Sequence, residues 1–492
     1  MRCATSRHPR GRAGGLAALG AVAAAGCAVG PDFQRPAVPP ESAYITAADA
    51  GTAAARRLQA GAELGAAWWQ LFHCTPLEEA VQAALRGSPT LRAANATLAQ
   101  AQEQVAVARG ALLPHVNAAA GAQHAVSGNP VPQAPNTYSL GLSAVYTLDV
   151  FGGARRSLEQ QGALAEAQRF QLAAAWLTLT GGVVTQALTV ASTRLQLSTT
   201  QELIASDRRN LELTQREFEV GTAAKSDVLT ADSQLAADLT QLPTLEQQLA
   251  AARDALAVLT GRAPVQWPGH DFDIGEFVAP TQIPLALPAQ LARRRPDVLA
   301  AEAQLHAASA AVGVAKADEF PNFELSAAVT RSALQAGGLF HDFDTLRSAG
   351  GSLSAPLFAG GALRAQTRAA RDAYRAQAAT YESVVIEALG QVTDDLWALQ
   401  HDVERLSVFR HSVDIASQAL KLQQDSYKAG KSNILQLIDA QRSYAQARLG
   451  LATAQVQQLQ DTAGLLVALG GGWWTDPAAQ GAATTGTSPA AT

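Results

Sequence analysis

Two stretches of the chain combine great length with hydrophobic residues at helical spacing. In the later stretch, apolar residues recur at steps of three and four and then of seven: Leu389, Val392, Leu396, Leu399, Val403, Leu406, Val413 and Leu420. This spacing predicts a helix with a heptad seam. Because no proline interrupts 154–220 or 361–429, each helix can reach about 100 Å at 1.5 Å per residue. Helices of that length predict a rod or a tube rather than a globule.

Two other segments alternate between apolar and polar residues. In the first, Tyr138, Leu140, Leu142, Ala144, Tyr146 and Leu148 alternate with Ser139, Gly141, Ser143 and Thr147, and in the second Phe323, Leu325, Ala327 and Val329 alternate with Asn322, Glu324, Ser326 and Thr330. Such segments suit transmembrane β-strands with one lipid-facing side, although a half-buried strand of a soluble sandwich has the same pattern. Polar loops at 127–136 and 332–344 would form the hairpin tips. Four strands cannot close into a barrel, and lipid does not tolerate an open edge, so two or three chains would have to share one.

The sequence contains an internal duplication. Pro89 to Pro114 and Pro296 to Pro321 enclose equal intervals at an offset of 207 (321 − 114), and Gly221 aligns with Gly430 at an offset of 209 (430 − 221). A register held this long indicates duplication. Each copy is expected to run helix, β-hairpin, long helix, tip turn, helix. The copies span 88–260 and 296–465, around a connector at 261–295 and before a C-terminal segment, 466–492, whose end we expect to be disordered. The shorter helices are expected at Thr90–Arg109 before the strands and at Asp227–Thr260 after the tip, stacked end to end.

The N-terminus has the layout of an export signal. Arginines precede a short apolar stretch that ends in small residues at position 26, directly before Cys27. Residues 1–26 are therefore predicted to be a signal peptide, too short to span a bilayer. The sequence before Cys27 is similar to a lipobox, with Ala24 where leucine is usual, so we expect a lipid on Cys27 and a lipid-anchored segment at 27–87. The alternative is an ordinary signal peptide followed by an incidental cysteine.

One charge-free stretch, 170–193, is long enough to span a membrane. It carries Gln171, Thr178, Thr185 and Ser192 at intervals of seven. A polar stripe at that spacing predicts a helix with one wet face and one packed face. We therefore expect this helix to lie in a water-filled assembly, with a transmembrane helix as the alternative.

Composition excludes several classes of protein. Charged residues make up 16% of the chain, with a net charge of −5, which argues against a nucleic-acid partner. After cleavage only Cys27 and Cys74 remain, so no intrachain disulfide framework is expected. The nine histidines form no metal-binding pair on one helix face, and no nucleophile, base and oxyanion-hole set is apparent. No metal, no cofactor other than the lipid, and no enzymatic activity are predicted.

Five motifs in order resemble one family. "CAVGPDFQRPAVP" from Cys27, "WWQLF" from Trp68, "LDVFGG" from Leu148, "RRPD" from Arg294 and "LIDAQRSYAQA" from Leu437 are similar to the pattern of TolC-type outer membrane factors, within them the NodT-like lipoproteins. The resemblance implies an α+β membrane protein: a homotrimer with a twelve-stranded β-barrel continuous with a twelve-helix tube. It also implies an outer-membrane location, a periplasmic adaptor (membrane fusion) protein and an inner-membrane pump of the resistance-nodulation-division class.

The resemblance implies two functional sites, at the positions of this chain that match the family's motifs. The first comprises the tips that would contact the adaptor: Val220, Gly221, Thr222, Ala429, Gly430 and Lys431. Independently of the family, Gly221 and Gly430 fit the C-cap positions of the two long helices.

The second site is the periplasmic entrance. It comprises Leu435, Asp439 and Arg442, which match family positions that constrict the closed tube. Three-fold symmetry would make an apolar collar of Leu435 and an acidic ring of Asp439 held by partners such as Arg442. The alternative is an ordinary surface pair of Asp439 and Arg442 at i and i+3, worth a few tenths of a kcal/mol.

The predicted function is a passive outer-membrane conduit of a tripartite export system, with a periplasmic gate that opens on assembly. A lipid-anchored coiled-coil tether of the envelope, without transport, is the alternative. It explains the long helices but not the amphipathic hairpins. The sequence does not name the cargo, since specificity usually lies in the pump.

Overall fold

The computed structural model describes residues 28–37, 44, 58–60, 64–124, 127–128, 132–133, 136–266, 269–286 and 288–481. Two compact units emerge, and each draws on both repeats. The strand unit takes its described residues from 28–36, 98–168 and 301–382, and the helix unit takes the others. The signal segment, Cys27 and the end of the C-terminal segment lie outside the described residues.

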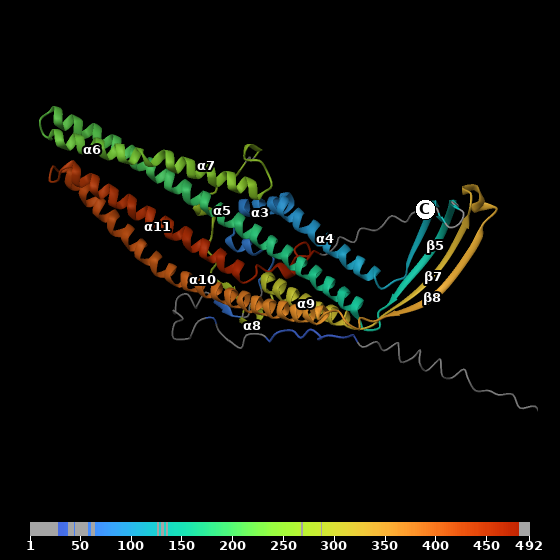
Figure 1. Ribbon diagram of the computed structural model, residues 1–492. Coiled ribbons are helices and arrows are strands. Elements are labelled where there is room, and N and C mark those ends of the chain that lie inside the picture. The colour runs from blue at the N-terminus through green and yellow to red at the C-terminus, as the bar shows by residue number, and fades with distance from the viewer. Residues whose placement is uncertain are drawn as a thin grey trace, which may run out of the picture. The chain divides into compact units, whose positions relative to one another are not determined.

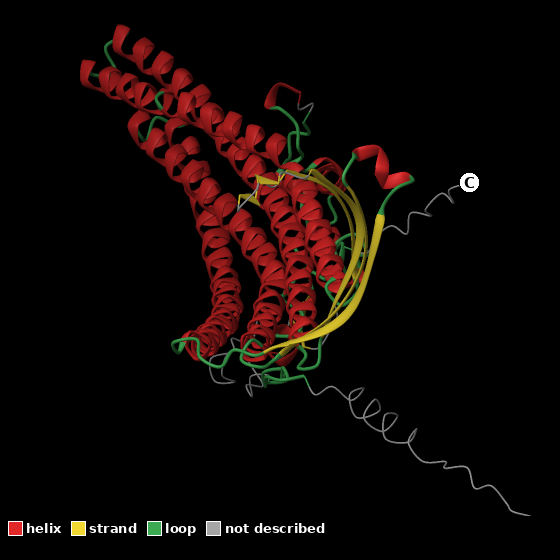
Figure 2. Cartoon of the chain, turned by 45° about the vertical axis from the view of Figure 1, so that its right-hand side comes forward, coloured by secondary structure: helices red, strands yellow, loops and turns green. Residues whose placement is uncertain are grey.

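The strand unit contains a four-stranded antiparallel sheet. Its strands are β2 (His115–His124), β5 (Asn136–Leu148), β7 (Asn322–Ala333) and β8 (Asp344–Ser354), in the order β2-β5-β7-β8. They curve together as one layer (Figures 1 and 2). The first hairpin loop contains the two-residue strands β3 (Ser127–Gly128) and β4 (Pro132–Gln133), and the second contains the 3-10 turn η4 (Ala336–Phe340). The two predicted hairpins are confirmed, and β2 and β8 form the two edges of the sheet.

The register separates the sheet into two chemically different faces. Leu142 pairs with Val329 and Tyr146 pairs with Leu325, whereas Ser143 pairs with Ala328. Directly paired residues share a face and neighbours along a strand alternate between faces. Leu142 and Tyr146 therefore lie on an apolar face, and Ser143 lies on a face of mostly small and polar residues that also carries Val145 and Leu346.

The first described residues of the chain pack within the strand unit. The Val29 amide donates to the carbonyl oxygen of Phe151 at 3.0 Å, and Arg156 pairs with Asp32 at 2.6 Å. A Cβ on Gly152 would collide with Ala28, so glycine permits this close approach. Ala28, the residue after Cys27, is thus held where β5 ends and the next helix begins.

Two helices of 67 residues each match the predicted long helices. They are α5 (Gly153–Glu219) and α10 (Ala362–Lys428). The shorter helices are α3 (Thr75–Gly87), α4 (Pro89–Gly110), α6 (Lys225–Leu239), α7 (Gln241–Leu259), α8 (Pro288–Leu291), α9 (Pro296–Ala317) and α11 (Ile434–Ala468). On the predicted seam of α10, Val392, Leu396, Leu399 and Leu406 are buried.

The predicted single helix at 227–260 is wrong in one respect, because it is divided at Thr240 into α6 and α7. Pro243 has no amide hydrogen to donate to the carbonyl of Leu239, so the helical hydrogen bonding is interrupted there. In the second repeat no proline occurs at this place, and α11 continues for 35 residues. The sequence contained this signal, since Pro243 lies within the predicted helix.

The charge-free stretch of α5 has the two faces that its polar stripe predicted. Gln171, Thr178 and Thr185 are exposed, whereas Trp176 and Leu188 are buried. Both α5 and α9 are long and apolar enough to cross a membrane by composition, but 56% and 67% of their apolar windows are buried within the chain. Burial of this extent identifies them as packed helices with a core face.

The short helices of each repeat meet end to end, as predicted. In the first repeat, Gly261 follows α7 with φ +74° and lies so close to Gly87 that a Cβ on either glycine would collide with backbone. In the second repeat, Arg295 precedes α9 and donates to the carbonyl oxygen of Ala468, in the last turn of α11, at 3.1 Å. The helix unit is completed by the parallel pair β1 (Leu58–Ala60) and β6 (Ile283–Leu285) and by the 3-10 turns η1 (Trp68–Phe72), η2 (Pro264–Gln266), η3 (Ile274–Glu276) and η5 (Trp473–Thr475).

Candidate functional site

The two tip turns have the same backbone. Gly221 has φ +82° and Gly430 has φ +70°. After α5 the amide of Thr222 donates to the carbonyl of Glu217 at 2.8 Å, and after α10 the amide of Lys431 donates to that of Ser426 at 2.9 Å. These six-to-one hydrogen bonds, each around a left-handed glycine, form Schellman caps. The predicted capping role of both glycines is confirmed.

The side chains at both tips are open to solvent. Val220 is 75% exposed, and Thr222, Ala429 and Lys431 are also exposed. Thr222 additionally donates its hydroxyl to the carbonyl of Glu217 at 2.9 Å. The tips therefore offer an apolar and a hydroxyl side chain in the first repeat, and a small and a cationic side chain in the second.

One hydrogen bond joins the last turns of the two long helices. The Tyr427 hydroxyl of α10 donates to Glu217 Oε1 of α5 at 2.5 Å. Burial, and then the bond to Glu217, raise the pKa of Tyr427 to about 12. Tyr427 therefore remains a neutral donor throughout the physiological range, and it holds the two repeats together beside the tips.

The three predicted gate residues lie in the first turns of α11 but have different surroundings. Leu435 is half-buried and packs against a small core of Ala231, Ile434, Leu437 and Ile438. Asp439 is exposed. Arg442 pairs with Asp238 of α6 at 3.1 Å rather than with Asp439. The alternative, a surface pair of Asp439 and Arg442, is not formed within the chain, because the guanidinium is taken up by Asp238, which is almost fully buried.

A second carboxyl group completes this buried site. Asp207 of α5 is 3% exposed and Asp238 of α6 is 1% exposed. Burial first, and then the hydrogen bond and charge of Asp238, raise the pKa of Asp207 to about 7, while Arg442 lowers it. Two carboxylates can hydrogen-bond each other only when one is protonated. Three helices thus meet at a group of two acids and one base whose charge depends on pH near neutrality.

Asp207 and Asp238 were not predicted from the sequence, although the sequence carries a signal for Asp207. Thr193, Thr200, Asp207 and Thr214 recur at intervals of seven along α5, and all four are buried. This second polar stripe lies at heptad spacing, as does the exposed stripe described above. A polar residue at a repeated core position is a known device for fixing helix register.

Another group of acids lies farther along α10 and α11. Asp402 is fully buried, and burial followed by the charge of Asp461 raises its pKa to about 7. Burial, and then Asp461, likewise raise the pKa of Asp395 to about 6. Among the described residues, no three His, Cys, Asp or Glu side chains are arranged to hold a metal ion.

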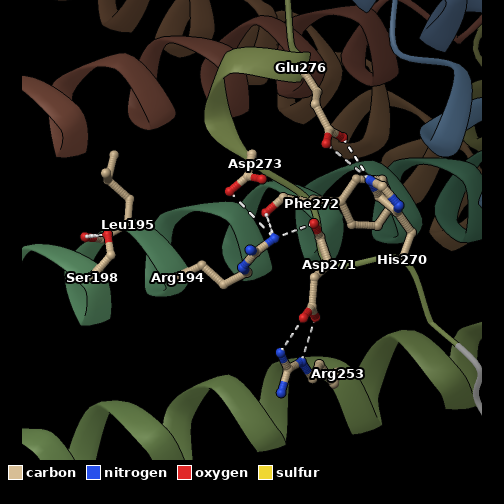
Figure 3. Close-up of polar contacts among 9 residues, drawn as sticks. All are labelled: Arg194, Leu195, Ser198, Arg253, His270, Asp271, Phe272, Asp273 and Glu276. Carbon is tan, nitrogen blue, oxygen red and sulfur yellow. Dashed lines mark hydrogen bonds and ion pairs between the residues drawn. The ribbon is translucent and has the colours of Figure 1, made fainter. Parts of the chain in front are cut away.

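The connector between the repeats is fixed by ion pairs to two helices (Figure 3). Arg253 of α7 holds both oxygens of Asp271 at 2.8 and 2.6 Å, and Arg194 of α5 pairs with Asp273 at 3.4 Å. Between these two acids Phe272 is fully buried. The charges in this cluster pair with one another, so its evident role is to clamp the connector onto the helices.

Comparisons with known proteins agree with this architecture. The family model described as "Outer membrane efflux protein" matches residues 80–262 and 287–471, which places one match on each repeat. The pyoverdine export outer membrane protein OpmQ of Pseudomonas aeruginosa is 31% identical over 83% of this chain and 88% of its own length. Nodulation protein T of Rhizobium leguminosarum bv. viciae is 29% identical over 91% of each chain.

A solved structure extends the likeness to the fold. The outer-membrane channel OprN is 29% identical, with a TM-score of 0.83, over 91% of this chain and all of the OprN chain. Two matches of one family model, relatives aligned over most of their length and a channel of the same fold lead to one conclusion. The chain belongs to the outer membrane efflux protein family and is a TolC-like channel component of an efflux system, located in the outer membrane and extending into the periplasm.

Proposed function

We propose that three copies of this chain assemble into one conduit, with a twelve-stranded barrel in the outer membrane and a twelve-helix tube in the periplasm. The observation that carries this proposal is the sheet, which has one apolar face and two open edges, β2 and β8. An open edge in lipid leaves backbone groups unsatisfied, so β8 of one copy must pair with β2 of another. Three copies supply twelve strands. The small and polar face, which includes Ser143, then lines the lumen.

Strand counting alone also allows two copies and eight strands. The family favours three, and so does the interior that a conduit needs, because an eight-stranded barrel is filled by its own side chains. No feature of the sheet favours the alternative of a non-transporting tether. The conduit is passive, and we propose no catalytic activity and no cofactor other than a lipid on Cys27.

The anchoring proposal rests on the placement of Ala28. The residue that follows Cys27 lies beside Gly152, between the end of β5 and the start of α5. An acyl chain on Cys27 would therefore begin at the periplasmic border of the proposed barrel. A single lipid chain contributes marginal binding beside a barrel, so Cys27→Ser behind a plain signal peptide should remain in the outer membrane, and a soluble periplasmic variant would contradict the barrel.

The tips and the gate segment define the proposed partners. We propose that the exposed side chains around Gly221 and Gly430 contact a periplasmic adaptor, which links the conduit to an inner-membrane pump of the resistance-nodulation-division class. In the closed state, three Asp439 carboxylates and three Leu435 side chains would narrow the periplasmic entrance. Opening on assembly would then require α11 to move against α5 and α6, where Arg442 meets Asp238.

A pair of substitutions on adjacent residues tests the barrel. Leu142→Arg places a further charge on the apolar face and is expected to destabilise the barrel, by up to the 2–4 kcal/mol or so that a charge costs at the middle of a membrane and by less toward its surfaces, whereas Ser143→Arg faces water and should be tolerated. The measurement is the yield of heat-modifiable complex with three times the mass of the mature chain, together with its conductance in a planar bilayer. Equal tolerance of both substitutions, or a complex of another mass, would overturn the proposal.

A further inference from the structure

Two arginines lie on the apolar face of the sheet. Arg331 of β7 pairs with Leu140 of β5, and Arg347 of β8 pairs with Val329 of β7, so both share the face of Leu142. Both are exposed. Within the described part of the chain neither forms an ion pair, and the guanidinium carbon of Arg331 lies 4.3 Å from the centre of the Phe343 ring. The face that the proposed barrel turns toward lipid therefore carries two positive charges without a protein counterion.

A shallow groove adjoins these charges. Ala144, Ala327 and Ala349 form one cross-strand row on the apolar face. Because alanines stand between rows of larger side chains, they leave a cavity of about 430 Å³ whose lining also includes Leu142 and Arg347. An apolar trough with a guanidinium in its wall fits a molecule that has both a hydrocarbon chain and an anionic group.

The positions of the arginines within the strands place them near the outer surface. Arg331 is two residues from the end of β7, and Arg347 is three residues from the start of β8. The hairpin between them carries Phe343 and the 75% exposed Phe340, whereas the opposite ends of both strands lead to helices. Aromatic residues flank the apolar band of a membrane barrel at its interfaces, and arginines there extend their charge toward the headgroups.

A second copy of the chain does not supply the missing anion. In the proposed trimer β8 pairs with β2 of the next copy. By the register with β5, the residues of β2 on the apolar face are Val116, Ala118, Ala120, Ala122 and His124. None of these carries a carboxylate, so the apolar face of the paired strands offers the two arginines no counterion. A phosphate suits two arginines in particular, because guanidinium groups bind phosphate oxygens in pairs.

We propose that Arg331, Arg347 and the alanine groove bind a phosphorylated glycolipid of the outer leaflet. The guanidinium groups hold its phosphate, and one acyl chain lies along the row of Ala144, Ala327 and Ala349. The proposal rests on the proposed barrel, which sets the direction of the apolar face. It adds a lipid-binding site that the conduit function does not require.

The test uses the full mature chain, purified in a neutral detergent, with bis-phosphorylated lipid A as the probe and native mass spectrometry to measure retention. A basic residue beside an anionic lipid contributes roughly fivefold in affinity, so the double variant Arg331→Gln/Arg347→Gln should bind about 25-fold more weakly. The control, Arg371→Gln/Arg410→Gln, removes the same charge from exposed sites on α10 and should bind like the wild type.

Two further arms identify the ligand and the groove. Lipid A without its phosphates should bind the wild-type protein as weakly as intact lipid A binds the double variant. Ala327→Leu fills the groove and should weaken lipid A binding while both arginines remain. Equal retention by the double variant, or displacement of lipid A by millimolar inorganic phosphate, would overturn the site. The complex mass and conductance are measured on the same samples, so a failure of the trimer is recognised separately.

Discussion

The two repeats have the same backbone at their tips but different chemistry in the helices that follow. Ala224 and Asn433 occupy the N-cap positions of α6 and α11, at an offset of 209 (433 − 224). In each case the amide of the N-cap residue donates to the side chain three positions on, Asp227 or Gln436. The same local hydrogen bonds therefore hold the two duplicated turns in the same conformation. Any difference in function between them must come from the side chains.

The side chains differ at each gate position. At the offset of 209, Leu435 corresponds to Ser226, Asp439 to Thr230 and Arg442 to Ser233. The first repeat therefore has small hydroxyl residues where the second has an apolar, an acidic and a basic residue. The first repeat contributes the buried acids Asp207 and Asp238 instead. The two copies thus share one scaffold but divide the charged residues near the proposed gate, with Arg442 in the second copy and the buried acids Asp207 and Asp238 in the first.

The largest effect is expected at the ion pair that joins the two repeats, Arg442 with Asp238. Arg442→Ala removes the cation that faces two buried acids, and breaking a buried pair from one side costs about 3 kcal/mol or more. We expect faster amide hydrogen exchange in α11 and higher conductance of the channel alone. The control is Arg448→Ala, which breaks an exposed pair with Glu202 and should cost less than about 1 kcal/mol. Equal effects of the two substitutions would show that burial of Asp238 is unimportant.

The acids of the first repeat should make the contact between repeats depend on pH. The pKa of Asp207 is raised to about 7 from an ordinary value of 3.8. Between these values the folded state holds a proton that the unfolded state has released, so stability falls as pH rises through this window. The slope is at most about 1.4 kcal/mol per pH unit.

Asp207→Asn tests this dependence. The variant keeps a hydrogen-bonding side chain beside Asp238 but does not titrate, so it should reduce the slope of the thermal unfolding profile between pH 5 and 7.5 and unfold at a higher temperature than the wild type at pH 8. The slope that remains is the contribution of Asp395 and Asp402, whose pKa values are also raised. Asp254→Asn on the exposed surface of α7 should leave the profile unchanged. A wild-type slope that persists in Asp207→Asn would assign the titration to another group.

Replacing Leu435 should reduce the difference between the two repeats at this proposed gate position. Leu435→Ala removes a half-buried side chain from the edge of the cluster around Ile438, with an expected cost of about 1 kcal/mol, below the range for fully buried leucines. If Leu435 also narrows the entrance, conductance should rise. Ser226→Ala changes the corresponding site in the first repeat and should alter neither quantity. Reduced stability with wild-type conductance would limit Leu435 to a packing role.

Periodicity predicted most of this fold because the long helices and the strands keep the same side buried or facing lipid along their whole length. The steps of three and four around Leu396 and the alternation around Leu142 each reflect one buried or lipid-facing side. The break at Thr240 could also have been predicted, from Pro243.

The partner of Arg442 could not be predicted, because Asp238 lies 204 residues away and nothing in either segment indicates that α6 and α11 come together. Local spacing instead favoured Asp439, three residues before Arg442. The motif around Asp439 predicted a gate segment, but it gave no information on pairing between distant helices, which depends on packing that a single sequence does not encode locally.

The smallest change in stability, and the sharpest test of the gate, concerns Asp439. Its exposed carboxylate forms no ion pair with Arg442, so Asp439→Ala should change the unfolding free energy by only a few tenths of a kcal/mol. In the proposed trimer, however, three such carboxylates form a ring at the entrance, and removing a ring of charge strongly alters conduction. The channel alone should then conduct more, and divalent cations added from the periplasmic side should block it less. Thr230→Ala, at the corresponding position of the first repeat, is the matched control. Wild-type conductance and undiminished cation block in Asp439→Ala would return Asp439 to the helix surface and leave the Arg442–Asp238 contact as the remaining candidate for the gate.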